Sequence, residues 1–367
     1  MPTIHEITTF LESLAPLPYQ ESYDNAGLIT GSGQWTCKGV LVTLDATEEV
    51  VQEAIQKGCN LVVAHHPILF RGLKKINGND YVEKSIIHAI KNDVALYAIH
   101  TNLDNVKRGV NNRIADRLGL VNRSVLLPKG GTLKKLFTFV PLEQAEAVKN
   151  ALFEAGGGQI GNYSECSFSV QGAGTFTAGE HTDPFVGRKG ERHTETEIKL
   201  EMVFPEYLEK RLVQALIKAH PYEEVAYDVV LLSNAHPGVG AGLLGELPQP
   251  AGEGDMLRLL KERFQLRVIR HTRLLGKPLK KVAVCGGAGS FLISKALQAG
   301  ADMYITADIK YHEFFDANGR MVIADIGHYE SEQYTVDLLL ELLKQKFSTF
   351  ALLKTEVSTN PVCYFTS

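Results

Sequence analysis

The sequence lacks both paired cysteines and any long apolar run. Its five cysteines are scattered over 367 residues, and none belongs to a Cys-x-x-Cys pair. This usage is typical of proteins in a reducing compartment. No stretch approaches the about 18 consecutive apolar residues of a membrane span, and the start, Met1 to Glu6, has no basic segment followed by an apolar one. We therefore expect a cytoplasmic protein with no membrane partner.

The chain also lacks a strong charge of either sign. Its formal net charge is −4, and no run of lysine and arginine stands out. A nucleic-acid surface usually carries a basic patch, so we expect no nucleic-acid partner. The hydrophobic content of 44% is ordinary for a globular protein, but 367 residues exceed what one core usually supports. We expect two domains, or one domain that carries a large insertion.

Apolar runs alternate with helical patterns in residues 1–130, which is typical of an α/β fold. Short β-rich runs end in polar residues, and helical spacing of apolar residues fills the segments between them. We predict helices over 4–14, 47–57, 81–91 and 111–118, and strands over 39–44, 60–64 and 94–99.

Two stretches of the second half repeat the first half. Residues 281–284 match 39–42, and residues 298–305 match 56–63, both at an offset of 242 positions. The repeated unit runs strand, helix, Gly, strand. Residues 1–130 and 247–367 are therefore predicted to be two similar halves of one α/β domain.

The segment between the halves has a different character. We predict strands over 136–140, 167–170, 175–177, 197–204 and 227–232, with helices over 141–154 and 206–219. This order is typical of a ferredoxin-like α+β domain. Gly- and Pro-rich stretches at 128–131 and 237–250 mark its edges, so we place the insert at residues 131–246.

Histidines and carboxylates follow the predicted apolar strands. Adjacent histidines are a poor choice for packing at a strand end, because buried ring nitrogens need partners. The carboxyl ends of parallel strands meet at one edge of a sheet. Imidazole and carboxylate ligands suit Zn, Mn, Fe or Co, and a bridging carboxylate can hold two such ions. We predict a site for two divalent ions per chain, with Zn as the expected ion, on His65, His66, Asp104, His328 and Glu332.

Two residues near this site have more than one interpretation. His100 precedes Asp104 by four positions, as His328 precedes Glu332. It is either a ligand, a group that orients Asp104, or a proton carrier, and we assign it as the catalytic residue. Asp308 stands at the repeat position of His66, so it either supports the site or caps a helix that begins near Ile309.

Two further motifs favour structural interpretations. The turn Gly286 to Ser290 could hold a phosphate on its backbone amides, but the dinucleotide and Walker fingerprints are both incomplete. A tight turn that needs small residues is favoured, and no residue is assigned to an organic cofactor. For His220 to Glu224, composition favours a solvated turn.

The order of these motifs resembles the Nif-three-like family, whose members are also labelled GTP cyclohydrolase 1 type 2 homologues. The insert is similar to the PII- or CutA-like middle domain of longer bacterial members, through residues 156–163 and 220–224. The motifs that carry the family resemblance are Asp24-Asn25-Ala26-Gly27, Ala64-His65-His66-Pro67, His100-Thr101-Asn102-Leu103-Asp104, residues 306–312 and residues 327–332.

The resemblance implies an α/β fold of two halves, a dinuclear metal centre between them and a homohexamer. The family's ligands fall on the five residues already named. A metal-dependent hydrolase that acts on a nucleotide or phosphorylated metabolite is the favoured function. The alternative is a non-catalytic protein that senses a metal or ligand.

Overall fold

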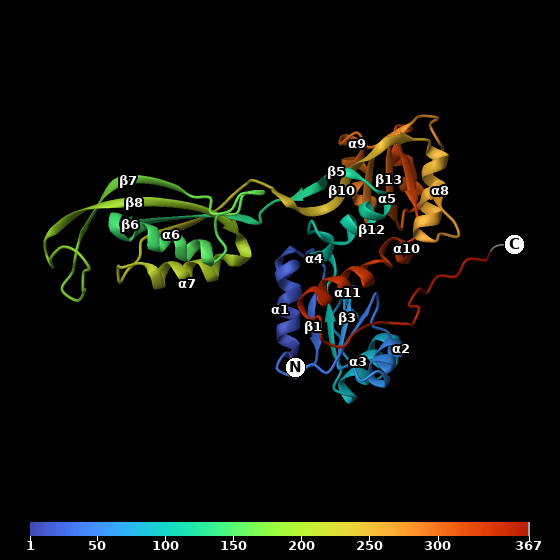
Figure 1. Ribbon diagram of the computed structural model, residues 1–367, viewed down its shortest axis with the longest axis horizontal. Helices are drawn as coiled ribbons and strands as arrows, with labels where there is room; N and C mark the ends of the chain where they lie inside the picture. Colours follow the sequence, from blue (N-terminus) through green and yellow to red (C-terminus); the bar gives the residue numbers. More distant parts are fainter. Residues whose placement is uncertain (366–367) are drawn as a thin grey trace. The chain divides into compact units, whose positions relative to one another are not determined.

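A computed structural model describes residues 1–365, which form two compact units (Figure 1). The larger unit combines residues 1–128 with the chain from Gly238 onward, and the smaller unit is Lys129–Pro237. The larger unit is α/β and the smaller is α+β, so the predicted fold class is confirmed. No helix among the described residues is long and apolar enough to cross a membrane.

The first half of the larger unit is built on a five-stranded sheet. Its centre is parallel and wholly buried, because helices cover both faces. One face packs on α1 (Ile4–Leu14) and α11 (Thr335–Lys346), and the other packs on α2 (Glu48–Gln56) and α3 (Tyr81–Lys91). The strand order is β1 (Gly27–Thr30), β4 (Ala95–Ala98), β3 (Leu61–Ala64), β2 (Val40–Thr43) and β15 (Leu352–Lys354).

The second half repeats this arrangement. Strands β14, β13 and β12 are parallel neighbours like β4, β3 and β2, and each set has an antiparallel strand beside its last member. The predicted repeat is therefore confirmed. The order in this sheet is β11 (Arg270–His271), β14 (Val322–Asp325), β13 (Met303–Ala307), β12 (Leu279–Ala288), β10 (His236–Ala251) and β5 (Val121–Lys129).

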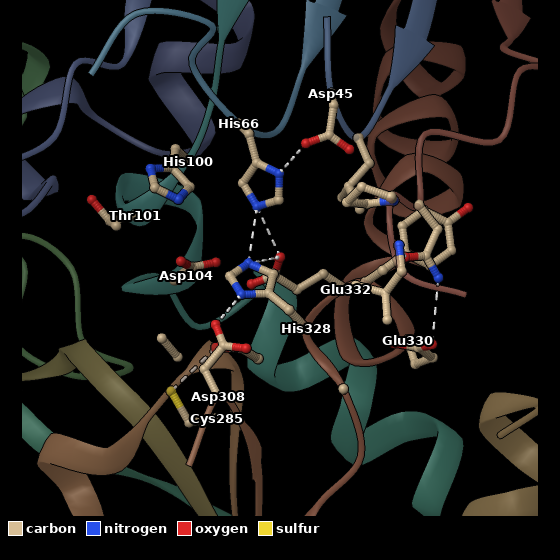
Figure 2. Close-up of a pocket in the computed structure, with 18 of the residues that line it drawn as sticks. Asp45, His66, His100, Thr101, Asp104, Cys285, Asp308, His328, Glu330 and Glu332 are labelled. Atoms are coloured by element: carbon tan, nitrogen blue, oxygen red, sulfur yellow. Dashed lines mark hydrogen bonds and ion pairs between the residues drawn. The ribbon is translucent and has the colours of Figure 1, made fainter. Parts of the chain in front are cut away.

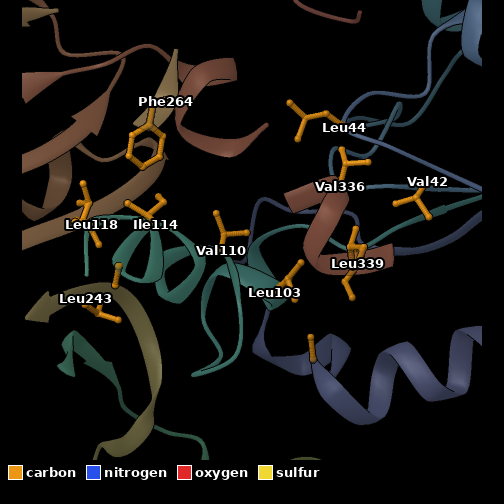
Figure 3. Close-up of a cluster of buried hydrophobic side chains, with 14 of the residues drawn as sticks. Val42, Leu44, Leu103, Val110, Ile114, Leu118, Leu243, Phe264, Val336 and Leu339 are labelled. Atoms are coloured by element: carbon orange, nitrogen blue, oxygen red, sulfur yellow. The ribbon is translucent and has the colours of Figure 1, made fainter. Parts of the chain in front are cut away.

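One hydrophobic core joins the two halves (Figure 3). Phe264 of α8 (Glu253–Phe264) and Ile114 of α5 (Val110–Leu118) belong to the same cluster as Val336 of α11. The remaining helical segments are α4 (Thr101–Asp104), α9 (Ile293–Gln298), α10 (His328–Glu332) and the short 3-10 turns Leu17–Tyr19, Ser290–Leu292 and Tyr311–Ala317.

The insert ends earlier than residue 246. Residues predicted as its Gly- and Pro-rich edge form β10, which pairs with β12 in the larger unit and lies beside β5. Gly240 and Gly242 adopt positive φ, which lets the strand bend. Pro248 and Pro250 fall where the pairing of β10 with β12 is interrupted, so their missing amides remove no hydrogen bond from that ladder.

The insert has the predicted ferredoxin-like order. Its four antiparallel strands are arranged β7 (Phe168–Thr177), β8 (Arg192–Pro205), β6 (Leu133–Pro141) and β9 (Tyr227–Leu231). Helices α6 (Ala145–Glu154) and α7 (Glu209–Ala219), each preceded by a 3-10 turn (Leu142–Gln144 and Glu206–Leu208), pack on one face of the sheet. The two short strands predicted at 167–177 are one strand.

His220 does not lie in a solvated turn. It is buried, and its Nε2 donates to the carbonyl of Phe139 at 2.9 Å while its Nδ1 accepts from the amide of Tyr222 at 3.1 Å. The composition of residues 220–224 favoured a surface turn, but local composition carries no information on this contact with a strand 81 positions away.

Candidate metal centre

The ends of three parallel strands supply the candidate site (Figure 2). Strand β3 leads into His65 and His66, β4 leads into His100 and α4, and β14 leads into α10. Side chains that follow neighbouring parallel strands meet at one sheet edge. Strands β3 and β4 belong to one sheet and β14 belongs to the other, so the rule gathers the ligands within each half only. The two sets meet because the two halves share one core, so the site lies between two sheets and not at the edge of one.

Glu332 lies at the centre of this group and is almost completely buried. Its Oε2 lies 2.9 Å from Nε2 of His66 and 3.2 Å from Nε2 of His328. Its Oε1 lies 3.9 Å from Nε2 of His65. The two carboxylate oxygens therefore face two different sets of candidate ligands.

The first set contains two polar atoms without partners. Nε2 of His65 and Oδ1 of Asp104 are buried, lie 3.7 Å apart and have no hydrogen-bond partner within residues 1–365. Nδ1 of His65 is held by the carbonyl of Ile99 at 2.8 Å. Buried polar atoms are rarely left unpaired, and a shared ion would satisfy both. Two ligands of one tetrahedral Zn lie roughly 3.3 Å apart, which is close to this spacing.

The second set is a triangle of close contacts. Nε2 of His66 and Nε2 of His328 lie 3.4 Å apart, and both contact the same oxygen of Glu332. Each ring is oriented through its other nitrogen: Nδ1 of His66 lies 2.8 Å from Asp45, and Nδ1 of His328 lies 2.7 Å from Asp308. A carboxylate partner on Nδ1 leaves Nε2 as the ligand atom.

Asp308 supports the site and is not a helix cap. The 3-10 turn that follows begins at Tyr311, and its N-cap residue is Lys310. Asp308 has a φ of +57°. The hydrogen bond from His328 and its charge hold the pKa of Asp308 below its usual value.

His100 lies beside the two adjacent histidines and contacts a residue that the strand rule did not select. Its ring centroid is 5.3 Å from the centroids of His65 and His66. Its Nδ1 lies 2.8 Å from Asp24, which also accepts hydrogen bonds from the amide and hydroxyl of Thr101. Burial opposes ionisation of Asp24, but these bonds lower its pKa to about 2.

The charges of the metal-free site are strongly coupled. Burial opposes protonation of both imidazoles, yet hydrogen bonds to carboxylates raise the pKa of His66 to about 10 and that of His328 to about 11. Glu332 is buried, but hydrogen bonds from the histidines hold its pKa well below the usual value. Burial raises the pKa of Asp104, against the attraction of His65.

Asp45 and Asp24 are the functional residues that sequence reasoning did not place in the site. Asp45 precedes α2 but does not cap it, because Thr47 is the N-cap residue. Both aspartates carried a signal: Asp45 follows the buried strand β2, and Asp24 belongs to a quoted family motif.

Gly286 and Gly287 lie in the last part of β12, where its register with β13 shifts, and they serve packing. The amide of Gly286 donates to Asn111, and that of Gly287 donates to the hydroxyl of Ser331. A Cβ on Gly287 would lie 2.4 Å from Oε1 of Glu332. Small residues are needed here so that Glu332 can occupy its position, as predicted, but residues 286–288 belong to a strand and not to the predicted tight turn.

The site opens into a cavity of about 690 Å³. Its lining carries seven carboxylates and one guanidinium, that of Arg270, which pairs with Asp325. Aromatic rings including Phe70, Phe291 and Tyr364 also line it. The arrangement offers three groups of residues that could hold an ion: His65 with Asp104 and Glu332; His66 with His328 and Glu332; and His65 with His66 and His100.

The chain is similar to known proteins over nearly its whole length. The chain is 37% identical to the GTP cyclohydrolase 1 type 2 homolog of Bacillus subtilis over 98% of each chain, and 38% identical to the protein of that name from Halalkalibacterium halodurans, also over 98% of each.

Solved structures match equally far along the chain. A Bacillus cereus protein related to NIF3 superposes with a TM-score of 0.86 at 38% identity, over 99% of each chain. A Staphylococcus aureus protein gives a TM-score of 0.79 at 30% identity, also over 99% of each chain. The family model described as Duf34/NIF3 (NGG1p interacting factor 3) matches residues 2–361, and the chain therefore belongs to this family, as its motifs predicted.

Proposed function

We propose that this protein is a metal-dependent hydrolase with a dinuclear centre. One ion would be held by His65, Asp104 and Glu332, and the other by His66, His328 and Glu332. The observation that carries the proposal is that Oε1 of Glu332 faces His65 while Oε2 faces His66 and His328. A carboxylate with this geometry is suited to bridging two ions.

Two divalent ions held there would polarise a substrate oxygen and lower the pKa of a water molecule. The residues around them set the geometry. Asp45 and Asp308 each hold one imidazole through Nδ1, which fixes the direction of Nε2. His100, whose Nδ1 is held by Asp24, presents its Nε2 as a proton acceptor beside the same histidines.

An anionic substrate would depend on the ions to bind in this cavity. Seven carboxylates would repel a phosphate group, and two divalent ions would reverse this charge locally. The aromatic rings of Phe70, Phe291 and Tyr364 offer faces on which a planar base can stack. Together with the name carried by the relatives, this supports a nucleotide or a phosphorylated metabolite as the substrate.

The first test is the metal content of the purified protein by elemental analysis. We expect about two divalent ions per chain in the wild type, Zn before Mn, Fe or Co, and fewer in Glu332→Gln. Glu330→Gln is the matched control, because Glu330 lines the same cavity but contacts Asn360 instead of a candidate ligand. No bound metal after reloading would mean that these residues are not a metal site.

The second test is turnover of the loaded protein on nucleotides and phosphoesters. Hydrolysis that requires metal and disappears in His66→Ala would support the hydrolase. Two bound ions with no turnover on any of these substrates would favour the alternative, a protein that senses a metal or ligand.

A further inference from the structure

The insert contains a second cavity, of about 650 Å³, whose lining residues all lie between Phe139 and Ala226. It lies over the sheet face formed by β7 and β8. The segment with Thr182, Pro184 and Phe185 and the segment with Tyr222 and Glu223 form its other walls. The two segments are joined by a hydrogen bond from the amide of Asp183 to Glu223, at 2.9 Å. The cavity is thus part of the insert alone.

Four aromatic residues line this cavity, and three of them, Phe176, Phe185 and Tyr222, lie close to one another. The ring centroid of Tyr222 lies 6.2 Å from that of Phe176 and 6.3 Å from that of Phe185. The ring planes are inclined by 59° and 52°, so the rings do not stack on one another. Inclined aromatic faces around a common space are the arrangement by which proteins hold organic cations, because each ring face carries partial negative charge.

A buried carboxylate lies in the same lining. The Glu197 side chain is directed onto the cavity side of the sheet, and the residue is only 8% exposed. Its Oε1 accepts a hydrogen bond from the hydroxyl of Tyr222 at 2.9 Å, whereas no donor within residues 1–365 contacts its Oε2. This oxygen is not among the fully buried unpaired atoms of the described residues, so it is open to the cavity, where a positively charged ligand would pair with it.

The glycines of β7 make room for this carboxylate. A Cβ on Gly174 would lie 2.0 Å from Oε2 of Glu197, so any larger residue there would displace the carboxylate. Gly172 pairs with Glu197 across the strands, and a Cβ on Gly172 would meet no atom within 4 Å. The space over Gly172 is part of the cavity.

The charge of the lining also favours a cation. Glu197, Glu223 and Glu224 face a single basic residue, Lys199. The ammonium of Lys199 is already paired with Glu201 at 2.9 Å, and it lies 4.7 Å from the ring centre of Phe137. A ligand in this cavity therefore meets an excess of negative charge.

We propose that the insert binds a small organic ammonium ion, with the cationic head between Phe176, Phe185 and Tyr222 and its charge against Glu197. A primary ammonium would donate to Oε2 of Glu197, and a methylated ammonium would place its methyl groups against the rings. Both share the chemistry that this cavity recognises, and the test separates them.

The test uses the full-length protein and isothermal titration calorimetry. The probes are choline, n-butylammonium and 3,3-dimethyl-1-butanol, which has the shape of choline without its charge. We expect one or both cations to bind, and the neutral alcohol to bind at least about 10-fold more weakly. Equal affinity for choline and the alcohol would overturn the proposal, as would the absence of binding by both cations.

Two variants locate the bound cation. Glu197→Gln keeps the shape and the acceptor for Tyr222 but removes the charge, so we expect at least about a 10-fold loss of affinity. Glu146→Gln on α6 is the matched control for this charge change, because its side chain is exposed and paired with Lys149. Gly172→Val should fill the cavity and abolish binding with little change in Tm, because the added methyl groups enter open space. Unchanged binding in either Glu197→Gln or Gly172→Val would overturn the proposal.

A final control separates this site from the metal centre. Binding of the cation should be unchanged after the metal ions are removed with a chelator. Loss of binding after chelation would place the cation at the metal centre and overturn the proposal.

Discussion

Nδ1 of His66 and Oδ1 of Asp45 lie 2.8 Å apart, so the orientation of a candidate ligand depends on a residue that follows a different strand. Asp45 in turn accepts a hydrogen bond from the hydroxyl of Thr359 at 2.6 Å. Both oxygens of Asp45 are therefore engaged. The Asp45 carboxylate connects the C-terminal segment to the centre of the site.

Replacing Asp45 should weaken metal binding without removing a ligand. In Asp45→Ala the imidazole of His66 loses the group that fixes its orientation, and we expect the affinity for Zn to fall about 10- to 100-fold. Competition with a fluorescent chelator measures this directly. Thr359→Val should give a smaller loss in the same direction, because it removes one hydrogen bond from Asp45. An unchanged affinity in Asp45→Ala would show that the contact has no part in metal binding.

Metal uptake at neutral pH should release protons. The pKa values of about 10 for His66 and about 11 for His328 mean that both rings are protonated in the metal-free protein. A coordinating imidazole must be neutral, so at least about two protons should leave per loaded chain and affinity should rise with pH up to about pH 11. Calorimetry in buffers of different ionisation enthalpy counts these protons, and a count of zero would contradict the assignment of both rings as ligands.

The same shifts set the pH dependence of the metal-free fold. Both pKa values are raised above the unfolded value of about 6.5, so this stabilisation is complete below pH 6.5 and is lost as the pH rises through about 10 to 11. Chemical denaturation of the metal-free protein across this range is the measurement. We expect the free energy of unfolding of wild type to fall toward pH 11 by more than that of His328→Gln.

Gly287→Ala should damage the site by more than its backbone strain. At a φ of +62°, any other residue costs roughly 1–2 kcal/mol of stability. The added Cβ would also lie 2.4 Å from Oε1 of Glu332, so the carboxylate must move and metal content should fall. Gly319→Ala is a close control, because its φ is +61° and no atom lies near its Cβ position. Equal metal content in the two variants would contradict the role given to Oε1.

His220→Ala should loosen the insert and leave the metal centre intact. The variant removes two hydrogen bonds of a buried ring, and leaving the amide of Tyr222 and the carbonyl of Phe139 unpaired should cost roughly 1–3 kcal/mol. Hydrogen exchange should then accelerate in residues 129–237 while metal content stays at the wild-type value. His181→Ala, at an exposed position, should change neither quantity.

The homohexamer remains a proposal that light scattering can test. Tyr311 and Phe315 are 73% and 67% exposed, and their rings lie 5.7 Å apart. Exposed neighbouring aromatic side chains are typical of protein interfaces. We expect a mass about six times that of the 40.4 kDa chain. A monomeric mass at micromolar concentration would contradict the proposal.

The sequence predicted best what depends on neighbouring residues. The helices 4–14 and 81–91 have the bounds of α1 and α3, because apolar spacing and capping residues are local signals. Strands β5 and β10 were missed, since their stability comes from pairing between distant segments and not from their own composition. The same limit explains His220, whose partner Phe139 lies in a strand far away in the sequence.

A rule about strand ends selected the five predicted ligands, and the structure brings their side chains together, although from the ends of strands in two sheets and not in one. Asp45 follows the buried strand β2, so it meets the same criterion as the histidines and could have been predicted to lie in the site. Asp24 precedes β1 and lies outside the rule. Its role became visible only when its contacts with His100 and Thr101 were known.

The insert leaves the larger unit after Pro128 and returns at Gly238, and the strands on either side, β5 and β10, are neighbours in one sheet. In topological terms, 109 residues occupy the place of a hairpin loop. An insertion of this kind can be gained or lost in evolution without changing the strand order of the sheet from which it emerges. The residues that line the two cavities can then evolve independently, although one gene encodes both.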